Sequence, residues 1–152
     1  LITLEQLPEI CKKIRKNSKI VTTNGCFDVL HLGHLKVIEF CEKFGEVILL
    51  LNSDSSVKSI KPNRPINNQK DRVYFLSRIK GIKYIVLFDQ KDPRKVLEII
   101  KPDFHVKSKS GYLGIEGETV EKNGGKLVLF EDLEGYSTTK ILKILEKMEQ
   151  LI

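Results

Sequence analysis

The fold follows from the stretch KIVTTNGCFDVLHLGHLKVIEFCEKFGEVILLLN (Lys19–Asn52). Its apolar residues follow first a strand pattern, then a helical spacing, and then a strand pattern again. The apolar run Lys19–Thr23 is typical of a strand, and a glycine-bearing loop follows it. Leu32–Gly45 has helical apolar spacing and ends in a glycine, as many helices do. Glu46–Asn52 is a continuous apolar run, which is typical of a parallel strand covered on both faces. The stretch therefore predicts two parallel strands joined by a helix.

The same alternation extends over the rest of the chain. Thr3–Lys16 has helical spacing behind Thr3, and Gln6 follows three residues later as in a capping box. Asp92 and Pro93 are typical of the cap and first residue of a helix. The further predicted segments are helices over Gln69–Lys80, Asp92–Lys101 and Ser137–Ile152, strands over Lys83–Phe88, Asp103–Lys107 and Gly125–Phe130, a short helix with a functional loop over 53–68, and an irregular glycine-rich segment over 108–118.

This order predicts an α/β fold, specifically a single doubly wound, Rossmann-like domain over residues 1–152. Its sheet should have five strands, mostly parallel, with right-handed crossovers. Ligands of such folds bind beyond the carboxyl ends of the strands, where the strand order reverses. The loop after the first strand lies where this rule places a ligand.

Composition indicates a folded globular protein. The chain is 41% hydrophobic and 30% charged, which excludes an extended disordered polymer. The three cysteines Cys11, Cys26 and Cys41 are odd in number and lack C-x-x-C spacing, which argues against a disulfide framework or a zinc knuckle. We expect Cys11 and Cys41 on the inner faces of helices. A reducing, cytoplasmic environment suits this pattern, and no stretch resembles a signal peptide.

The charge of the chain favours anionic partners. Its net charge is +6, but the lysines are spread along predicted helices without the aromatic and basic pattern of a nucleic-acid reader. No apolar run approaches the ~20 residues that a membrane-spanning helix needs. We therefore expect a small phosphorylated ligand, with neither nucleic acid nor membrane as partner.

His31 and His34 stand three residues apart at the predicted start of a helix, with Gly33 between them. Such residues share one face of the first helical turn, and the free N–H groups there favour a phosphate. This pattern suits phosphoryl transfer, which chiefly needs positioning and charge stabilisation. Spacing alone leaves a metal site, a general base and an ordinary turn open. Zinc is disfavoured because Cys26 and Asp28 lack an established ligand spacing.

Two segments resemble one known family. NGCFDVLHLGH (Asn24–His34) resembles the signature of the cytidylyltransferase-like nucleotidyltransferases, whose G-x-F-D-x-x-H-x-G-H loop binds a nucleoside triphosphate. STTKI (Ser137–Ile141) resembles the S-T-T-x-I sequence that opens the final helix of that family. The resemblance covers nearly the whole chain and is strongest to the nucleotidyltransferase domain of bacterial ADP-heptose synthases.

The resemblance implies a role for individual residues. His31 and His34 would contact the α- and β-phosphates and stabilise the transition state, and Lys36 and Arg72 would hold the acceptor phosphate or the leaving pyrophosphate. The side chain of Asp28 would shape the loop. The implied nucleotide-binding residues are Asn24, Gly25, Cys26, Phe27, Asp28, Gly33, Asn52, Asp54, Lys107, Ser137, Thr138 and Thr139.

Three of the residues in this region have two interpretations. Asn52 and Asp54 follow the second strand and either cap the next helix or line the nucleotide pocket. Arg64 either joins the basic residues that would hold the acceptor phosphate or pyrophosphate, or belongs to a simple turn at the sequence NRP.

The resemblance also implies a reaction. A sugar 1-phosphate, with D-glycero-β-D-manno-heptose 1-phosphate preferred, would attack ATP and release pyrophosphate, giving ADP-heptose. Mg²⁺ would be bound through the triphosphate rather than by protein side chains, and the protein would be a homodimer. The alternative is a cytidylyltransferase that makes CDP-glycerol from CTP and glycerol 3-phosphate.

Two departures from the family patterns bear on this choice. KSKSGY (Lys107–Tyr112) stands where heptose enzymes carry a K-G-G-D-Y-like segment, so an acidic residue is missing and a lysine is added. DLEGYSTT (Asp132–Thr139) has Asp132 where glycerol-3-phosphate cytidylyltransferases have arginine, which favours the heptose branch.

Overall fold

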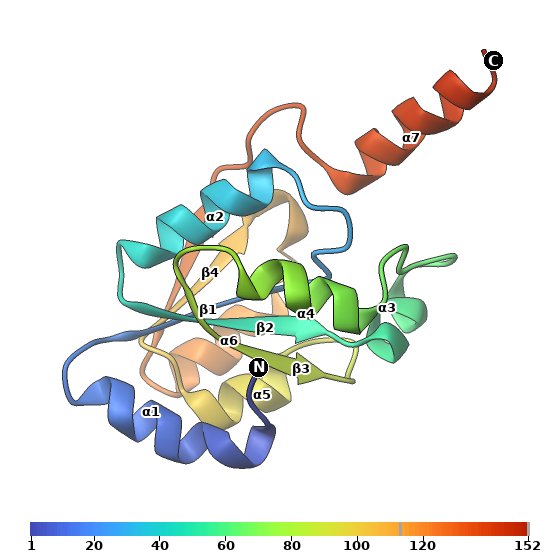
Figure 1. Ribbon diagram of the computed structural model, residues 1–152. Coiled ribbons are helices and arrows are strands. Elements are labelled where there is room, and N and C mark those ends of the chain that lie inside the picture. The colour runs from blue at the N-terminus through green and yellow to red at the C-terminus, as the bar shows by residue number, and fades with distance from the viewer. Residues whose placement is uncertain (113, 152) are drawn as a thin grey trace.

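A five-stranded parallel sheet forms the centre of the computed structural model, which describes residues 1–112 and 114–151 (Figure 1). The strand order is β3–β2–β1–β4–β5, and every neighbouring pair is parallel. The strands are β1 (Ile20–Gly25), β2 (Glu46–Asn52), β3 (Ile82–Phe88), β4 (Phe104–Ser108) and β5 (Lys126–Phe130). The order reverses between β1 and β4, so the predicted doubly wound fold is confirmed and its switch point lies there.

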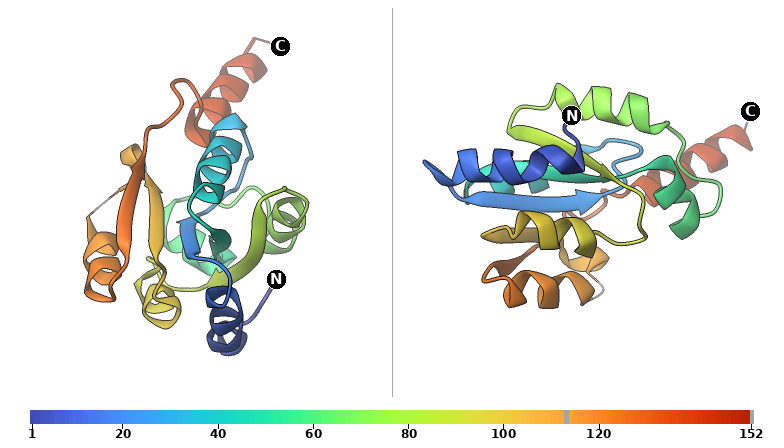
Figure 2. Two further views of the ribbon diagram at one scale, coloured as in Figure 1. Left: turned by 90° about the vertical axis from the view of Figure 1, so that its left-hand side faces the viewer. Right: turned by 90° about the horizontal axis from the view of Figure 1, so that it is seen from below.

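Helices cover both faces of the sheet (Figures 1 and 2). One layer contains α1 (Leu7–Arg15), α5 (Arg94–Ile100) and α6 (Ile115–Lys122), and the other contains α2 (Leu32–Glu42) and α4 (Gln69–Ser77). The remaining helices are α3 (Asp54–Ile60), α7 (Thr138–Glu149) and the short 3₁₀ helices Leu4–Gln6 and Lys109–Gly111. Figure 1 shows α7 extending away from the sheet.

Strand β2 explains why the central strands have continuous apolar runs. Ile48 and Leu50 pack with α1 and α5, whereas Leu49 and Leu51 pack with α4. Successive residues of a strand point to opposite faces of the sheet, and helices cover both faces. All four side chains are therefore fully buried. Cys11 and Cys41 lie buried on the inner faces of α1 and α2, as expected.

Local capping signals correctly marked several helix starts. The backbone N–H of Thr3 donates to Gln6, which completes the predicted capping box. Ser137 accepts a hydrogen bond from the Lys140 N–H at 3.1 Å and caps α7. The start of α5 differs from the prediction by one residue, because the helix begins at Arg94 and Pro93 is its N-cap. The Asp92 carboxylate still accepts a hydrogen bond from the backbone N–H of Arg94 at 3.1 Å, and it also binds the Arg94 guanidinium.

The prediction of an irregular segment over 108–118 was wrong in its second half, where α6 begins at Ile115. Gly114 and Gly117 weaken the local helical signal. The helix is stabilised by packing rather than by local propensity: Thr119 and Val120 are buried, and Val120 belongs to the hydrophobic core beneath the sheet.

Gly45 also has a different role from the one predicted. Helix α2 ends three residues earlier, and a Cβ atom on Gly45 would lie 2.3 Å from the Lys19 carbonyl oxygen. The glycine therefore allows β2 to begin beside β1.

Candidate active site

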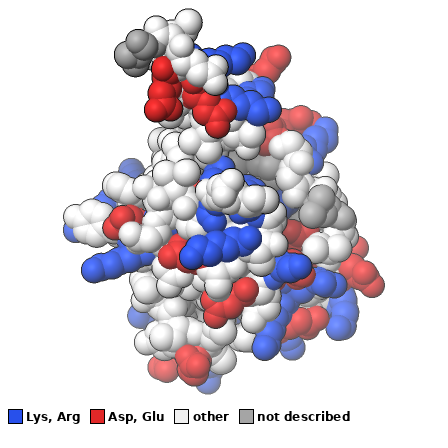
Figure 3. Space-filling view, turned by 90° about the vertical axis from the view of Figure 1, so that its right-hand side faces the viewer, with Lys and Arg blue, Asp and Glu red and all other residues white. Residues whose placement is uncertain are grey.

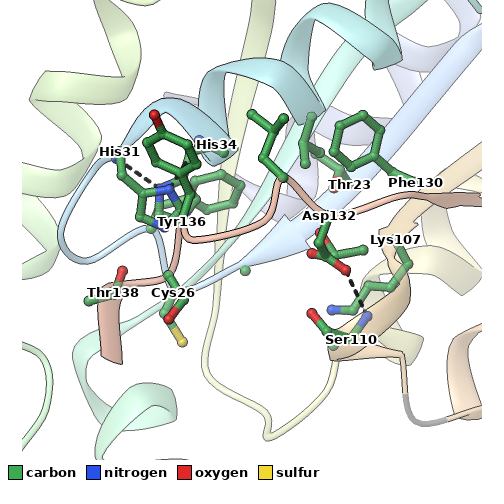
Figure 4. A pocket seen from close by; sticks show the side chains of 18 of the residues that line it. Thr23, Cys26, His31, His34, Lys107, Ser110, Phe130, Asp132, Tyr136 and Thr138 are labelled. Carbon is green, nitrogen blue, oxygen red and sulfur yellow. Dashed lines mark hydrogen bonds between the residues drawn. The ribbon is translucent and has the colours of Figure 1, made fainter. Parts of the chain in front are cut away.

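A cleft opens at the carboxyl ends of β1 and β4, at the switch point of the sheet (Figure 4). Its volume is about 290 Å³. The walls come from the end of β1 and the loop after it, the start of α2, the end of β4 and the segment that leads into α7. On the face toward which the strands point, Lys and Arg side chains gather near the middle (Figure 3). The cleft thus has the position and charge expected of a site for an anionic ligand.

The first turn of α2 is capped by the two histidines themselves. His31 is the N-cap, and its Nδ1 accepts a hydrogen bond from the Gly33 N–H at 3.1 Å. His34 completes a reciprocal capping box, because its Nδ1 accepts from the His31 N–H at 3.2 Å (Figure 4). The two rings lie 3.9 Å apart between centroids, and the His34 ring packs on Phe27 at 5.0 Å.

This capping decides which ring nitrogens can meet a ligand. A neutral imidazole that accepts a hydrogen bond at Nδ1 carries its proton on Nε2. Burial lowers the pKa of His31. Burial, with the charges of His31 and Lys61, lowers the pKa of His34 to about 4. Both side chains are therefore neutral near pH 7 and offer Nε2–H donors, which suits phosphate oxygens better than general-base chemistry.

Gly33 is required by the His31 ring. A Cβ atom at this position would lie 2.9 Å from Nδ1 and Cε1 of His31, and 3.4 Å from Cβ of Tyr136. The spacing H-x-G-H thus lets the first imidazole fold back over the helix start. The close approach that excludes a side chain here is made by the protein itself.

Asp28 shapes the loop after β1, as the resemblance implied, and does not line the cleft. Its carboxylate accepts hydrogen bonds from Arg64 at 2.5 Å and from the backbone N–H groups of Ile66 and Asn67 at 2.8 Å each. Burial alone would raise the pKa of Asp28, but these hydrogen bonds outweigh burial and lower it. Arg64 is therefore the partner of Asp28 in a nearly buried ion pair.

Arg72 lies elsewhere than its predicted catalytic role requires. It is fully buried and does not line the cleft. Its guanidinium donates to the carbonyl oxygens of Cys26, Asn52 and Asn67 and to the carboxylate of Asp54, at 2.7 to 3.0 Å. Arg72 is thus a clamp between loops, and its donors are used inside the fold.

Asn52 and Asp54 are also structural. Asn52 is 4% exposed and donates to Ser56 Oγ, while Asp54 pairs with Arg72. The cap of α3 is Ser53 rather than either of them. Neither of the two lines the cleft, in contrast to the prediction.

The two candidate lysines differ in position. Lys36 forms an exposed ion pair with Glu39 at 2.7 Å and does not line the cleft. Lys107 does line it, and its ammonium donates to Asn24 Oδ1 at 3.0 Å. The structure therefore brings Lys107, but not Lys36, to the predicted site.

The predicted residues that line the cleft come from both ends of the chain. Thr138 ties them together, because its hydroxyl donates to the Val29 carbonyl at 3.0 Å, across the loop after β1. The N-termini of α2 and α7 therefore converge on one cleft, and both favour an anion. The predicted residues found here are Asn24, Gly25, Cys26, Phe27, His31, Gly33, His34, Lys107, Ser137, Thr138 and Thr139.

Several cleft residues were not among the predicted site residues. Lys61 follows α3, and Asp132 and Tyr136 precede α7. Asp132 Oδ2 accepts a hydrogen bond from the Ser110 N–H at 2.9 Å, which joins the segment after β4 to the segment after β5 (Figure 4). Ser110 and Asp132 belong to the two segments, Lys107–Tyr112 and Asp132–Thr139, that depart from the family patterns. Lys61 lies in the segment 53–68 that was predicted to contain a functional loop, but no motif distinguished this lysine from a solvated residue at a helix end.

Nothing in the described chain forms a protein-only metal site. Residues 1–112 and 114–151 contain no group of three or more His, Cys, Asp or Glu side chains placed to hold a metal ion. None of the helices in the same residues has the length and apolar character needed to cross a membrane.

Comparison with known proteins shows the family to which the chain belongs. The family described as cytidylyltransferase-like matches residues 22–144, from β1 into α7. The chain is 40% identical over 153 residues to the bifunctional protein HldE of Aliarcobacter butzleri, covering 97% of this chain and 31% of that relative. It is 42% identical over 147 residues to HldE of Campylobacter concisus, covering 94% of this chain and 30% of the relative. The chain thus spans about a third of the length of these relatives.

Solved structures share the fold at lower identity. The lipopolysaccharide core biosynthesis protein of Thermoplasma volcanium superposes with a TM-score of 0.68 at 24% identity, over 78% of this chain and 100% of that one. A pantoate–β-alanine ligase of Francisella tularensis gives a TM-score of 0.62 at 14% identity, over 99% and 77% of the two chains.

Proposed function

The chain belongs to the cytidylyltransferase-like family, and from this premise we propose that it transfers the adenylyl group of ATP to a sugar 1-phosphate. The observation that carries the proposal is the pair of Nε2–H donors of His31 and His34 at the cleft. The start of α7 lies across the same cleft. These groups form a cradle for the phosphates of a nucleotide.

The proposed reaction needs no covalent enzyme intermediate. An oxygen of the acceptor phosphate attacks the α-phosphorus of ATP in line, and the bond from that phosphorus to the oxygen bridging to the β-phosphate breaks. Pyrophosphate leaves with the electron pair. His31 and His34 donate hydrogen bonds to phosphate oxygens on which charge increases, and Lys61 and Lys107 add positive charge.

Mg²⁺ enters this proposal with the triphosphate. The cleft is lined mainly by donors and cations, and its acidic side chain is Asp132. Phosphate oxygens would therefore supply most of the ligands, and the ion would offset the charge of the triphosphate. The residues of this chain hold the phosphates that surround it.

The preferred acceptor is D-glycero-β-D-manno-heptose 1-phosphate, with ADP-heptose as product. The support is the 40 to 42% identity to bifunctional HldE proteins over nearly all of this chain. The proposal further includes one nucleotidyltransferase domain, a cytoplasmic location and a homodimer. CTP with glycerol 3-phosphate is the alternative pair, and no feature of the cleft favours it.

A pyrophosphate-release panel tests the proposal. It crosses ATP, CTP, GTP and UTP with heptose 1-phosphate, glycerol 3-phosphate and other phosphorylated acceptors. We expect release with ATP and heptose 1-phosphate. Activity only with CTP and glycerol 3-phosphate would replace the proposed substrates, and the absence of release with every pair would favour a non-catalytic nucleotide-binding module.

Two variants at one position link activity to the histidine donor. Asparagine at position 34 can keep an acceptor near Nδ1 but loses the Nε2–H donor, whereas glutamine places an N–H near Nε2. We expect His34→Asn to lower kcat by about 10²-fold or more, which is the usual effect of losing one oxyanion donor. We expect His34→Gln to lower kcat by a smaller factor. Lys70→Ala, at an exposed residue of α4 outside the cleft, is the control that should retain activity.

A further inference from the structure

Glu116 is an unusual residue to find inside this fold. It is 4% exposed, lies in the first turn of α6, and points toward the sheet. Its Oε2 has no hydrogen-bond partner among the described residues, and its Oε1 lies 3.5 Å from Nζ of Lys107. Burial of a carboxylate is unfavourable unless both of its oxygens are paired. In Glu116 only one of the two oxygens has a partner within the described chain.

The contact of Glu116 leads directly to the cleft. Lys107 stands near the carboxyl end of β4, with its side chain 14% exposed. Its ammonium donates to Asn24 Oδ1 at 3.0 Å, from the end of β1. Glu116 and Asn24 therefore approach the same ammonium from α6 and from β1, and they hold it at the switch point of the sheet.

The surroundings of Lys107 oppose its charge. Burial lowers its pKa, and Glu116 acts against this effect. The imidazole of His105 is two residues away on the same strand and fully buried. Burial lowers its pKa to about 3, so the ring is neutral near pH 7 and adds no positive charge beside Lys107. The titratable groups that face or surround this ammonium are Glu116 of α6, Cys26 after β1, Lys61 after α3, His105 of β4 and Asp132 after β5.

We infer that Glu116 is a positioning residue for the transfer reaction, because it holds the Lys107 ammonium charged and directed at the phosphates in the cleft. This inference rests on the proposed function and adds to it a residue outside the cleft. A purely structural Glu116 would leave its own charge half-paired without benefit to the fold. Glu118, two residues later and exposed, offers a carboxylate on the same helix that cannot reach Lys107.

The first test measures the pH dependence of kcat and KM for pyrophosphate release. Glu116→Gln should lower kcat by about tenfold or more at pH 8 and move the alkaline limb of the profile down by about one pH unit, since Lys107 loses its partner. Glu116→Asp keeps the charge and should restore the limb in part. Glu118→Gln should match the wild type. An unchanged alkaline limb in Glu116→Gln would overturn the inference.

A second measurement does not depend on activity. In protein labelled with ¹³C-lysine, the Cε signal of Lys107, assigned by its loss in Lys107→Arg, reports the pKa of this side chain. We expect a lower pKa in Glu116→Gln than in the wild type and no change in Glu118→Gln. Equal values in all three proteins would refute the inference, whether or not the wild type releases pyrophosphate. If the wild type releases none, the proposed function fails separately.

Discussion

His31 and His34 each use one ring nitrogen for folding, and in the proposed function the other nitrogen binds the ligand. The Nδ1 atoms accept backbone N–H groups at the start of α2, so the same two side chains cap the helix and carry the Nε2–H donors. Because helix formation positions the rings, the donors are preorganised before a ligand arrives, which favours transition-state stabilisation.

Gly33→Ala tests this dependence. The new Cβ would lie 2.9 Å from two atoms of the His31 ring, so the ring must move. We expect kcat to fall by about 10²-fold, the effect of a displacement near 1 Å, while the melting temperature changes little. Leu35→Ala, on the same first turns of α2 and 39% exposed, is the control. Wild-type kcat in Gly33→Ala would show that the ring position is unimportant.

The buried histidines also predict how stability depends on pH. His34 has a pKa of about 4 and His105 a pKa of about 3 in the fold, below the ordinary value of 6.5. Above pH 6.5 both are neutral whether folded or unfolded, so they cause no pH dependence. Below it the unfolded chain binds protons that the fold excludes, and stability is lost as the pH falls toward 4.

Urea unfolding between pH 4.5 and 7 measures this loss. Each such histidine should contribute up to about 1.4 kcal/mol per pH unit in this window. His105→Leu removes one of the two groups and should reduce the slope by about that amount, at the cost of the hydrogen bond to Thr22 at 2.8 Å. An unchanged slope would mean that His105 is protonated within the fold.

Among the elements, the loops after β1 and β2 depend on α4. Arg72, on the inner side of α4, donates hydrogen bonds to the carbonyl oxygen of Cys26, in the loop after β1, and to that of Asn52, the last residue of β2. Asp28, in the loop after β1, accepts hydrogen bonds from backbone N–H groups of the segment before α4. The cleft wall is thus held by a helix whose own residues do not line it.

Arg72→Lys distinguishes this role from the catalytic role predicted from sequence. Lysine keeps the charge but cannot form the four hydrogen bonds, so the free energy of unfolding should fall by about 3 kcal/mol or more. Arg78→Lys, where the arginine stacks on exposed Tyr74, should change it by less than about 1 kcal/mol. Wild-type stability with a large loss of activity in Arg72→Lys would restore the catalytic interpretation.

At the scale of the whole molecule, α7 contributes its first residues to the cleft and extends beyond the rest of the fold (Figure 1). Ile144, Leu145 and Met148 on this helix are each more than half exposed. Exposed apolar patches of this kind mark sites of protein association. They support the homodimer expected from the family resemblance, with a second copy of the chain covering α7.

Light scattering with size-exclusion chromatography tests the dimer. We expect the wild type to have twice the mass of one chain and Ile144→Asp to shift it toward the monomer, because a carboxylate would have to be desolvated at the interface. Lys147→Gln, about one turn later on the exposed helix, changes the net charge by the same one unit and is the control for charge. A monomeric wild type would refute the dimer.

Sequence patterns predicted most of the fold because they are local. The run Glu46–Asn52, the capping box of Thr3 and the cap at Ser137 each express their structure within a few residues. Helix α6 was missed because long-range packing, rather than local propensity, stabilises it. For the site, the histidine loop and STTKI were found from motif and position, and the structure brings them to one cleft.

The sequence by itself determined the order of the elements, the switch-point loop and the histidine pair, since spacing and capping act between near neighbours. Only the tertiary structure decided the position and the partners of each charged residue. Arg72, Lys36 and Lys107 look alike in sequence, yet one is a buried clamp, one is solvated and one faces the cleft. The reason is physical: burial and pairing depend on contacts between segments such as β4 and α6, which local spacing does not encode.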